Sequence, residues 1–536
     1  MKNYSAKEIK NIVLIGAPGT GKTTLAEAMA FEGKVIDRRG SIENNNTLSD
    51  NTDIEHEYKR SIYSTTLFTE FMDRKLNIID CPGSDDFCGS LFSAFKVGDV
   101  GVMVLNAQNG WEVGSELQSR YARLLNKPLI GVVNQLDGDK ANFDATVEGI
   151  RANSSVKPVI VQYPINQGAG FDSFIDVLMM KMYKFVDENG KREEHPIPEN
   201  ELERANALNQ ELAEAAAVYD DALMELYFEK GSLTQDDIRA GLKLGVSKRD
   251  VMPIFCASGK RDIGTKRLME FIINVAPGPL KAPAFLSTEG EELIANAEEP
   301  TVVFVFKSQI EQHIGEITYF RVIRGKITEG AEVINTRTQN KEKISQLFAV
   351  AGKNRVKVSE MVAGDLGCTV KLKGTHTNDT LAGAASKQLS ALPMASEYGL
   401  SPLDFEGVTP KLLVKVGDEV KAGTPLFFNK ADARILFTSP VSGVVSAINR
   451  GEKRKVLSVT VTPAEKQTYE EFPKLDVKKA SREEVVELLL KAGLWPMIQQ
   501  RPYGIIANPS DCPKAIFVSA FDSAPLAPDY NFVVEG

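Results

Sequence analysis

An eight-residue motif near the N-terminus constrains this chain more than any other feature. Residues 16–23 read Gly-Ala-Pro-Gly-Thr-Gly-Lys-Thr, which fits the pattern G-x-x-x-x-G-K-[S/T]. An apolar run at residues 12–15 precedes the motif, and a helix-forming stretch at residues 25–29 follows it. Backbone N–H groups of a glycine-rich turn and of a helix N-terminus can surround phosphate oxygens. The sequence therefore predicts an α/β domain that binds a nucleoside triphosphate. The predicted contacts are Gly16, Gly19, Thr20, Gly21, Lys22, Thr23 and Thr24.

Two further motifs bear on the base and the metal ion. Asn134 and Asp137 follow the apolar run at residues 129–133, and so lie at the carboxyl end of a predicted strand. A carboxylate at residue 137 can accept both guanine N–H groups, whereas adenine offers no such pair of donors. A polar loop that opens a helix at Asp137 is the alternative. Upstream, a second predicted strand ends in Asp80-x-x-Gly83, where Asp80 and Thr23 would hold Mg²⁺ and Gly83 would turn toward a γ-phosphate.

With these motifs in this order, the sequence resembles the translational GTPases, and elongation factor G most closely, over about residues 8–383. The resemblance implies bound GTP or GDP with Mg²⁺, and the ribosome as a partner. Residues 252–259 resemble the last guanine-contacting loop of that family, with Ser258 as the contact residue. Residues 213–227 and 233–239 resemble its helical insert, and residues 304–307, 320–327 and 363–366 resemble its β-barrel domain II.

The sequence departs from the family at the positions that hydrolyse GTP. Ser84 occupies the place of the histidine that positions the attacking water, and its hydroxyl is too short and too weakly basic to replace it. Tyr63 occupies the place of the switch threonine that binds Mg²⁺, although Ser64 or Thr65 could supply the hydroxyl if the segment is shifted. We therefore expect guanine-nucleotide binding with slow or absent hydrolysis.

Two further departures, of which the change at residue 135 is the milder kind, lie in the nucleotide-binding motifs. Gln135 replaces the lysine whose stem covers the guanine ring, and the stem of a glutamine can also lie over a ring. Gly19 stands where the family usually has an aspartate in the phosphate loop.

The segment after residue 383 follows a different plan. Residues 411–428 and 435–448 read as short strands separated by Gly-Asp and Ser-Pro-x-x-Gly turns, as in the barrel-sandwich domains of lipoyl and biotin carriers. Lys430 is the candidate attachment residue. It lacks the flanking methionines of a biotin site and the preceding aspartate of a lipoyl site, so we expect no covalent group.

This second segment resembles the flavin-free, cytoplasmic-face subunit of the Na⁺-translocating NADH:quinone reductase. Residues 398–407, 449–454, 483–495 and 513–520 carry the resemblance, which covers only the leading part of that subunit. It implies contact with the membrane subunits of the reductase. The chain is then either a translation-factor relative with an appended tail, or a partial redox subunit with a foreign head. An artificial or mis-assembled fusion is a third interpretation.

Composition limits the remaining possibilities. The 536 residues carry a net charge of −9, which argues against a protein that coats nucleic acid by bulk attraction. The five cysteines form no CxxC pair, and no apolar run approaches the ~18 residues of a membrane span. We therefore expect a cytoplasmic protein.

The motifs and resemblances together divide the chain into four expected parts. These are a P-loop GTPase domain at residues 1–283 (insert about 155–250), a β-barrel at 290–383, a barrel-sandwich domain at 384–475 and a partial α/β segment at 476–536.

Overall fold

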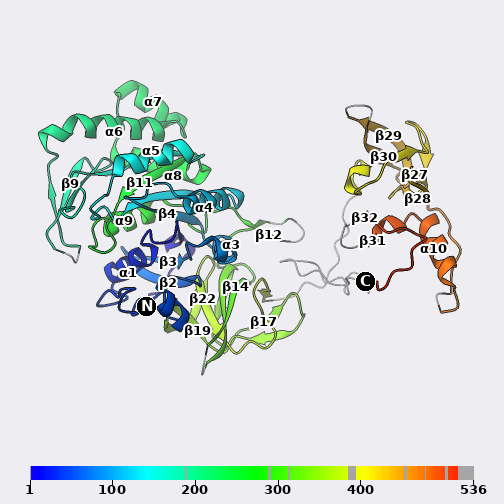
Figure 1. Ribbon diagram of the computed structural model, residues 1–536, viewed down its shortest axis with the longest axis horizontal. Helices are drawn as coiled ribbons and strands as arrows, with labels where there is room; N and C mark the ends of the chain where they lie inside the picture. The colour runs from blue at the N-terminus through cyan, green and yellow to red at the C-terminus, as the bar shows by residue number, and fades with distance from the viewer. Residues whose placement is uncertain are drawn as a thin grey trace. The chain divides into compact units, whose positions relative to one another are not determined.

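The computed structural model describes two compact units, one within residues 1–387 and one within residues 388–520 (Figure 1). The described residues are 2–187, 190–287, 290, 292–311, 314–383, 394–451, 455–476, 478–500 and 505–516.

A seven-stranded sheet forms the centre of the first unit. All neighbouring strands are parallel except β2, which runs antiparallel to β3 at one edge. Strand β1 is buried along its whole length, including its polar residues Lys10 and Asn11, because helices cover both faces of a parallel sheet. The strand order is β2 (Thr65–Phe71), β3 (Arg74–Asp80), β1 (Ile9–Ile15), β4 (Val100–Asn106), β5 (Leu129–Asn134), β11 (Val251–Cys256) and β6 (Lys157–Ile160).

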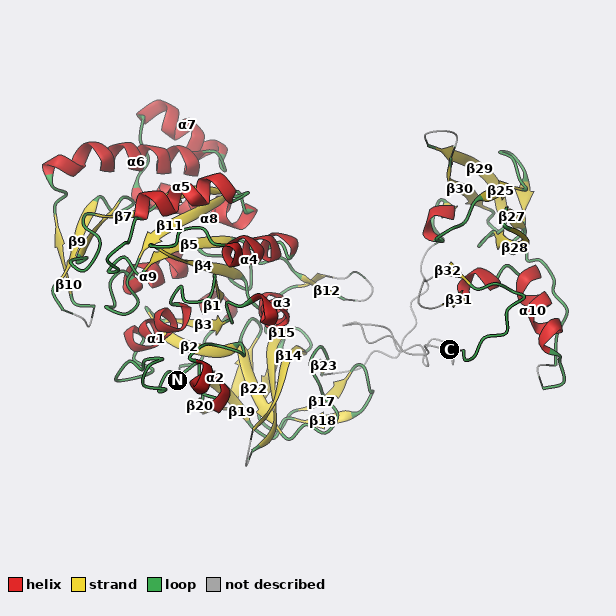
Figure 2. Ribbon diagram, viewed as in Figure 1, coloured by secondary structure: helices red, strands yellow, loops and turns green. Residues whose placement is uncertain are grey.

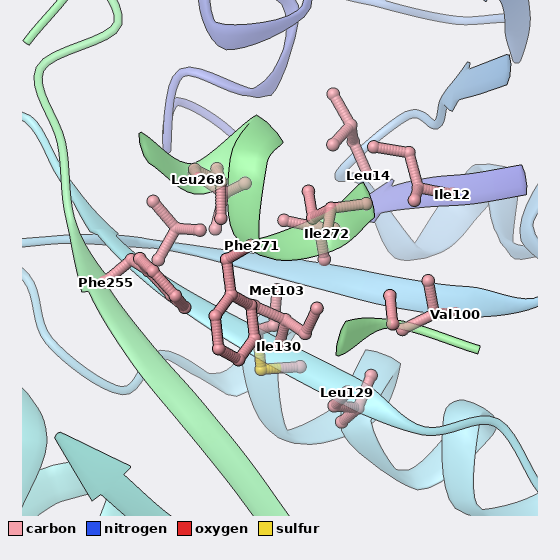
Figure 3. Packing of buried hydrophobic residues seen from close by; sticks show 14 of the residues in the cluster. Ile12, Leu14, Val100, Met103, Leu129, Ile130, Phe255, Leu268, Phe271 and Ile272 are labelled. Carbon is pink, nitrogen blue, oxygen red and sulfur yellow. The ribbon is translucent and has the colours of Figure 1, made fainter. Parts of the chain in front are cut away.

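Helices flank this sheet and close its core (Figure 2). Figure 3 shows side chains of β1, β4, β5 and β11 packed against Leu268, Phe271 and Ile272 of α9. The rings of Phe255 and Phe271 lie 4.7 Å apart. Outside the insert described below, the helices of this domain are α1 (Lys22–Glu32), α2 (Asp53–Tyr58), α3 (Cys88–Val97), α4 (Val113–Leu124), α5 (Phe143–Asn153) and α9 (Thr265–Val275).

The insert between β6 and β11 holds the expected helices and also a four-stranded antiparallel sheet that the sequence did not predict. Its strands are too short to show a clear period of two, which is why the sequence pattern missed them. Arg267 of α9 ties the insert to the domain through Asp176, with a distance of 2.9 Å between Nη2 and Oδ2. The insert contains β7 (Gln162–Pro164), β8 (Ser173–Asp176), β9 (Lys181–Phe185), β10 (Arg192–His195), α6 (Glu199–Ala217), α7 (Asp221–Lys230) and α8 (Gln235–Lys248).

The rest of the first unit is a β domain with its own apolar core. Phe68 of β2 belongs to this core, so the edge of the seven-stranded sheet packs directly against the β domain. Its eight-stranded sheet runs in the order β18 (Lys341–Lys343), β17 (Glu332–Asn335), β23 (Thr380–Ala382), β14 (Val302–Glu311), β15 (Gly315–Arg324), β22 (Leu366–Val370), β19 (Leu347–Ala351) and β20 (Asn354–Val358). Two strand pairs accompany it, β16 (Lys326–Thr328) with β21 (Glu360–Val362), and β12 (Phe285–Leu286) with β13 (Glu292–Leu293).

The second unit contains two small antiparallel sheets around a separate apolar core. One sheet has the order β24 (Tyr398–Leu400), β30 (Val456–Pro463), β29 (Gly443–Arg450) and β26 (Glu419–Val420), and the other β25 (Pro410–Leu412), β27 (Pro425–Asn429) and β28 (Asp432–Thr438). Helix α10 (Arg482–Lys491) and the pair β31 (Gln499–Gln500) and β32 (Ile505–Ile506) follow.

The structure confirms the fold class expected from the sequence. Exposed Lys430 lies in the turn between β27 and β28. Residues 384–390, where the two resemblances meet, lie outside the described residues, as do residues 452–454 and 517–520 of the stretches that carry the redox-subunit resemblance. Among the helices that are described, none combines the length and the apolar character needed to cross a membrane.

Candidate nucleotide-binding site

The phosphate loop connects the end of β1 to the start of α1. Gly21, with φ of 85°, precedes the first residue of α1. The ammonium group of Lys22 is buried and donates to the carbonyl oxygens of Gly16 and Ala17, at 2.8 and 2.9 Å. Burial lowers the pKa of Lys22, and the charge of Asp80 opposes that shift. A phosphate at the mouth of this loop would meet a fixed cation and the N-terminus of α1.

Two glycines of the phosphate loop have no room for a side chain. At Gly16, with φ of 142°, an added Cβ would lie 2.1 Å from the carbonyl oxygen of Val104. At Gly21 it would lie 2.5 Å from Nδ2 of Asn134. These contacts leave no room for a side chain, whereas Gly19 faces open space. Thr20 closes the loop by donating to the Ala17 carbonyl at 3.0 Å, and Thr24 is half-buried in α1.

Oxygen donors meet at the start of α1. Thr23 Oγ1 donates to Asp80 Oδ2 at 2.7 Å, and Oδ1 of Asp80 is buried with no hydrogen bond in the described structure. Burial raises the pKa of Asp80. Hydroxyl and carboxylate oxygens fit Mg²⁺, which usually takes one or two protein carboxylates and fills its shell with phosphate and water. The described residues contain no group of three acidic, histidine or cysteine side chains that could hold a metal ion.

Asp50 and Ser61 also belong to this cluster, although the sequence did not point to them. The Asp50 side chain belongs to a residue only 4% exposed, and neither carboxylate oxygen accepts a hydrogen bond from the described residues. Burial and the nearby charge of Asp80 raise the pKa of Asp50 to about 7. Ser61 Oγ lies 3.2 Å from Thr23 Oγ1. A cation here would therefore have two further oxygen donors in residues 50–65, which we call the switch segment.

The switch segment places a different hydroxyl beside Thr23 from those that the sequence suggested. Tyr63 is 46% exposed, and the Glu55 carboxylate accepts its backbone N–H at 3.1 Å. The hydroxyl close to Thr23 belongs to Ser61, and neither Ser64 nor Thr65 takes that place. Ser64 accepts a hydrogen bond at its carbonyl from Lys307, and the Thr65 hydroxyl donates to Ser49.

The predicted guanine-reading loop lies against the phosphate loop. Asn134 donates from Nδ2 to the Thr20 carbonyl at 2.9 Å, and its Oδ1 accepts the N–H of Gly259 at 3.0 Å. Gln135 donates from Nε2 to the Gly19 carbonyl at 2.8 Å and accepts from Asn106 Nδ2, also at 2.8 Å. The two amides therefore connect the phosphate loop to the ends of β4, β5 and β11.

The predicted base contacts lie beside these amides. The buried Ser258 immediately precedes Gly259, and its Oγ accepts the backbone N–H of Arg261 at 3.3 Å. Asp137 is half-buried, and its carboxylate makes no hydrogen bond with any described residue. A carboxylate without an internal partner is available for the N–H groups of a base.

The Asp-x-x-Gly segment crosses the phosphate loop at close range. A Cβ on Gly83 would lie 2.6 Å from Lys22 Nζ and 2.7 Å from the Pro18 nitrogen. Ser84 follows with its hydroxyl donating to Asp86 Oδ2 at 3.2 Å. Gln118 of α4, another residue that the sequence did not indicate, contacts both the phosphate loop and Gly83.

The fold and the site together define a P-loop nucleotide-binding protein, since the loop between β1 and α1 meets the acidic end of β3 and the polar loop after β5. The family model for the elongation factor Tu GTP binding domain matches residues 7–278, which is half of the chain. The chain belongs to this family.

Three further family models match the remaining sequence. Elongation factor G domain 2 matches residues 300–384, the NqrA N-terminal barrel-sandwich hybrid domain matches 373–464, and the NqrA second alpha/beta domain matches 480–536. The overlap at 373–384 includes β23, which pairs with β14 and β17 of the β domain. The chain thus joins elongation-factor domains to NqrA-like domains, as the sequence resemblance predicted.

A solved structure supports the fold. The crystal structure of ttk003000868 from Thermus thermophilus matches with a TM-score of 0.64 and 24% sequence identity, over 86% of this chain and 64% of that chain. This chain therefore spans less than two thirds of the length of the matched structure.

Proposed function

We propose that this chain is a guanine-nucleotide-binding relative of elongation factor G that hydrolyses GTP slowly or not at all. The observation that carries the proposal is the arrangement around Gly83. The phosphate loop, Lys22 and the Asp-x-x-Gly segment converge there, but the next side chain is Ser84, whose hydroxyl donates to Asp86.

Guanine selectivity rests on Asp137 and its neighbours. Its carboxylate has no partner among the described residues, and Asn134 holds the loop beside Ser258 and the phosphate loop. Two N–H donors of guanine would satisfy this carboxylate, whereas adenine would leave it partly desolvated and unpaired. The same logic makes Asp137 the residue on which base choice depends.

Slow hydrolysis rests on the absence of a suitable base at residue 84. A positioned general base contributes about 10²–10⁴-fold to such reactions. Mg²⁺, held by Thr23 and Asp80, would neutralise phosphate charge when it is bound. The half-buried Ser84 offers neither the basicity nor the reach of an imidazole, so that contribution is lost.

The partner and location follow from the family. We propose that the part of the chain that resembles elongation factor G, about residues 8–383, contacts the ribosome and acts in the cytoplasm. We propose that it lacks the translocase activity of a complete elongation factor G. We propose the same division into domains that the sequence suggests, with parts at residues 1–283, 290–383, 384–475 and 476–536.

A second candidate function concerns the tail. Residues 394–516 include a compact unit with its own apolar core, which favours a part that folds independently of the head. In this alternative the chain is a partial NqrA subunit of the quinone reductase, and its tail binds the membrane subunits without a lipoyl or biotin group on Lys430. An artificial or mis-assembled fusion is the third candidate, and sequencing of the gene junction in its native genome tests it.

Nucleotide titration tests the main proposal. Fluorescent GDP, GTP and ATP analogues should show binding of both guanine nucleotides and at least tenfold weaker binding of ATP. Phosphate release should stay slow with and without ribosomes, and release at a rate typical of translational GTPases would refute slow hydrolysis.

A matched pair of variants tests the base contact. D137A should weaken GDP binding by tenfold or more, while D139A, at an exposed residue of the same loop, should bind GDP as the unaltered protein does. Equal affinity in both variants would exclude Asp137 as the base contact.

A further inference from the structure

Gln118 of α4 connects the phosphate loop to the Asp-x-x-Gly segment. Its Oε1 accepts the backbone N–H of Gly16 at 2.6 Å, and its Nε2 donates to the Gly83 carbonyl at 3.2 Å. The residue is 3% exposed, so both ends of the amide are used inside the protein. One side chain therefore fixes the position of one segment relative to the other.

The packing of α4 keeps Gln118 in place. Gly114, one turn earlier on the helix, faces the phosphate loop so closely that an added Cβ would lie 3.1 Å from both Cα and Cβ of Ala17. Helix α4 is thus fixed against the loop through its first turn, and the amide of Gln118 has little freedom to leave its two partners.

The backbone carbonyl and the backbone N–H of Gly83 differ in their hydrogen bonding. Its carbonyl is held by Gln118, whereas its N–H donates to no acceptor in the described residues. The residue is buried and touches the phosphate loop near Lys22 and Pro18. A buried N–H without an acceptor is costly, and a phosphate oxygen beyond the β-position would satisfy it.

We propose that Gln118 is a positioning residue that sets the preference of this site for a nucleoside triphosphate over a diphosphate. It holds the Gly83 carbonyl so that the Gly83 N–H is ready for the terminal phosphate. A diphosphate does not reach Gly83 and gains nothing from this contact. The inference rests on the proposed nucleotide-binding function and adds the side chain that discriminates between its two ligands.

The same amide also supports the phosphate loop through Gly16, and this second contact predicts a different result. Loss of loop support would weaken both nucleotides equally, because both have α- and β-phosphates. Loss of the Gly83 contact would weaken only the triphosphate. The ratio of the two dissociation constants therefore separates positioning of Gly83 from a general structural role.

Two variants and one control suit the test. Q118E keeps an acceptor for Gly16 but replaces the donor to Gly83 with a second oxygen, and Q118M removes both hydrogen bonds at similar volume. Q108L alters an exposed glutamine in the loop between β4 and α4 and is the matched control. Circular dichroism melting identifies a variant that fails to fold, in which case the other variant carries the test.

The measurement is the dissociation constant of the full chain for fluorescent GDP and for a non-hydrolysable fluorescent GTP analogue. In Q118E and Q118M the ratio of triphosphate to diphosphate dissociation constants should rise by about fivefold to tenfold, as expected for one lost hydrogen bond. Q108L should leave the ratio unchanged. If the ratio of dissociation constants is unaltered in a folded Gln118 variant, this inference is overturned and the proposed function is not affected. Absence of binding by the unaltered protein overturns the proposed function as well.

Discussion

Lys75 of the GTPase domain and Asp365 of the β domain form a buried ion pair, with 2.7 Å between Nζ and Oδ1. The Lys75 side chain is fully buried and that of Asp365 is 7% exposed. Asn77 donates to Asp365 and to Asn11, and Asn11 donates to Asp99. Arg321 of the β domain completes the network with 2.7 Å between Nη1 and Asp99 Oδ1. Charged side chains thus join the two domains.

Removal of one partner from this pair should destabilise the protein strongly. K75M leaves the Asp365 carboxylate buried beside amides alone, and we expect a loss of about 3–5 kcal/mol in the free energy of unfolding. Urea denaturation of K75M, D365L and the double variant measures the effect. The double variant should recover much of the loss because no unpaired charge remains.

The control for this prediction is the exposed pair of Lys2 and Asp73, whose side chains are 52% and 88% exposed. K2M should change the free energy of unfolding by less than about 0.5 kcal/mol, as is usual for surface pairs. A loss in K75M no larger than that in K2M would contradict the importance of the buried network.

The parts of the site that sequence predicted are those encoded in short contiguous segments. Lys22 and Thr23 begin α1 and Asp80 ends β3, positions that short motifs identify without knowledge of the fold, and the structure brings Thr23 and Asp80 together. Gln118 reaches the site from the middle of a helix, and its local sequence gives no signal of that contact. Asp50 and Ser61 depend on the path of an irregular segment, which is decided by tertiary contacts.

The same contrast applies to the fold. The long parallel strands and the helices carry strong apolar patterns and were predictable. The four-stranded sheet of the insert has strands of three to five residues, which pair only because neighbouring chain segments bring them together. The position of Lys307 was also hidden, since it depends on a register shift between Val305 and Lys307 in the pairing of β14 with β15.

Lys307 should make stability depend on pH. It donates to the Ser64 carbonyl at 2.6 Å, and burial lowers its pKa to about 8 from an ordinary value of 10.5. Between pH 8 and 10.5 Lys307 keeps its proton in the unfolded chain but has lost it in the folded protein. The cost of burying a charged ammonium group therefore falls as pH rises, and the free energy of unfolding increases over this range. The contribution has a slope of at most about 1.4 kcal/mol per pH unit.

K307M removes this contribution and should flatten the pH dependence. Urea denaturation of K307M and the unaltered protein between about pH 7.5 and 10 measures the difference in their unfolding free energies. The unaltered protein should gain stability relative to K307M across that range. K341M, at an exposed lysine on β18, should show no such relative change with pH. Parallel curves for K307M and the unaltered protein would mean that Lys307 titrates normally.

Asp50 should strengthen the binding of the divalent ion that accompanies the nucleotide. Its carboxylate is buried without a hydrogen bond in the described structure, close to the charge of Asp80. D50N removes one negative charge from the cluster and should raise the dissociation constant for Mn²⁺, measured by electron paramagnetic resonance with GDP present, by about tenfold. D53N, at an exposed residue in the first turn of α2, is the control and should bind Mn²⁺ normally.

Ser84 should be the position at which hydrolysis can be restored. An imidazole at residue 84 would follow Gly83 directly, in the place where the family has its water-positioning histidine. We expect S84H to raise the single-turnover rate of phosphate release by at least about tenfold, part of the 10²–10⁴-fold that a positioned base supplies. S84A removes only a hydroxyl that donates to Asp86 and should leave the rate unchanged. Rapid-quench measurement with ribosomes compares the three proteins at equal nucleotide occupancy.

If S84A is slower than the unaltered protein, the serine hydroxyl itself takes part in the reaction. If S84H is no faster, the limit on hydrolysis lies in the switch segment, where Tyr63 faces solvent and Ser61 lies beside Thr23.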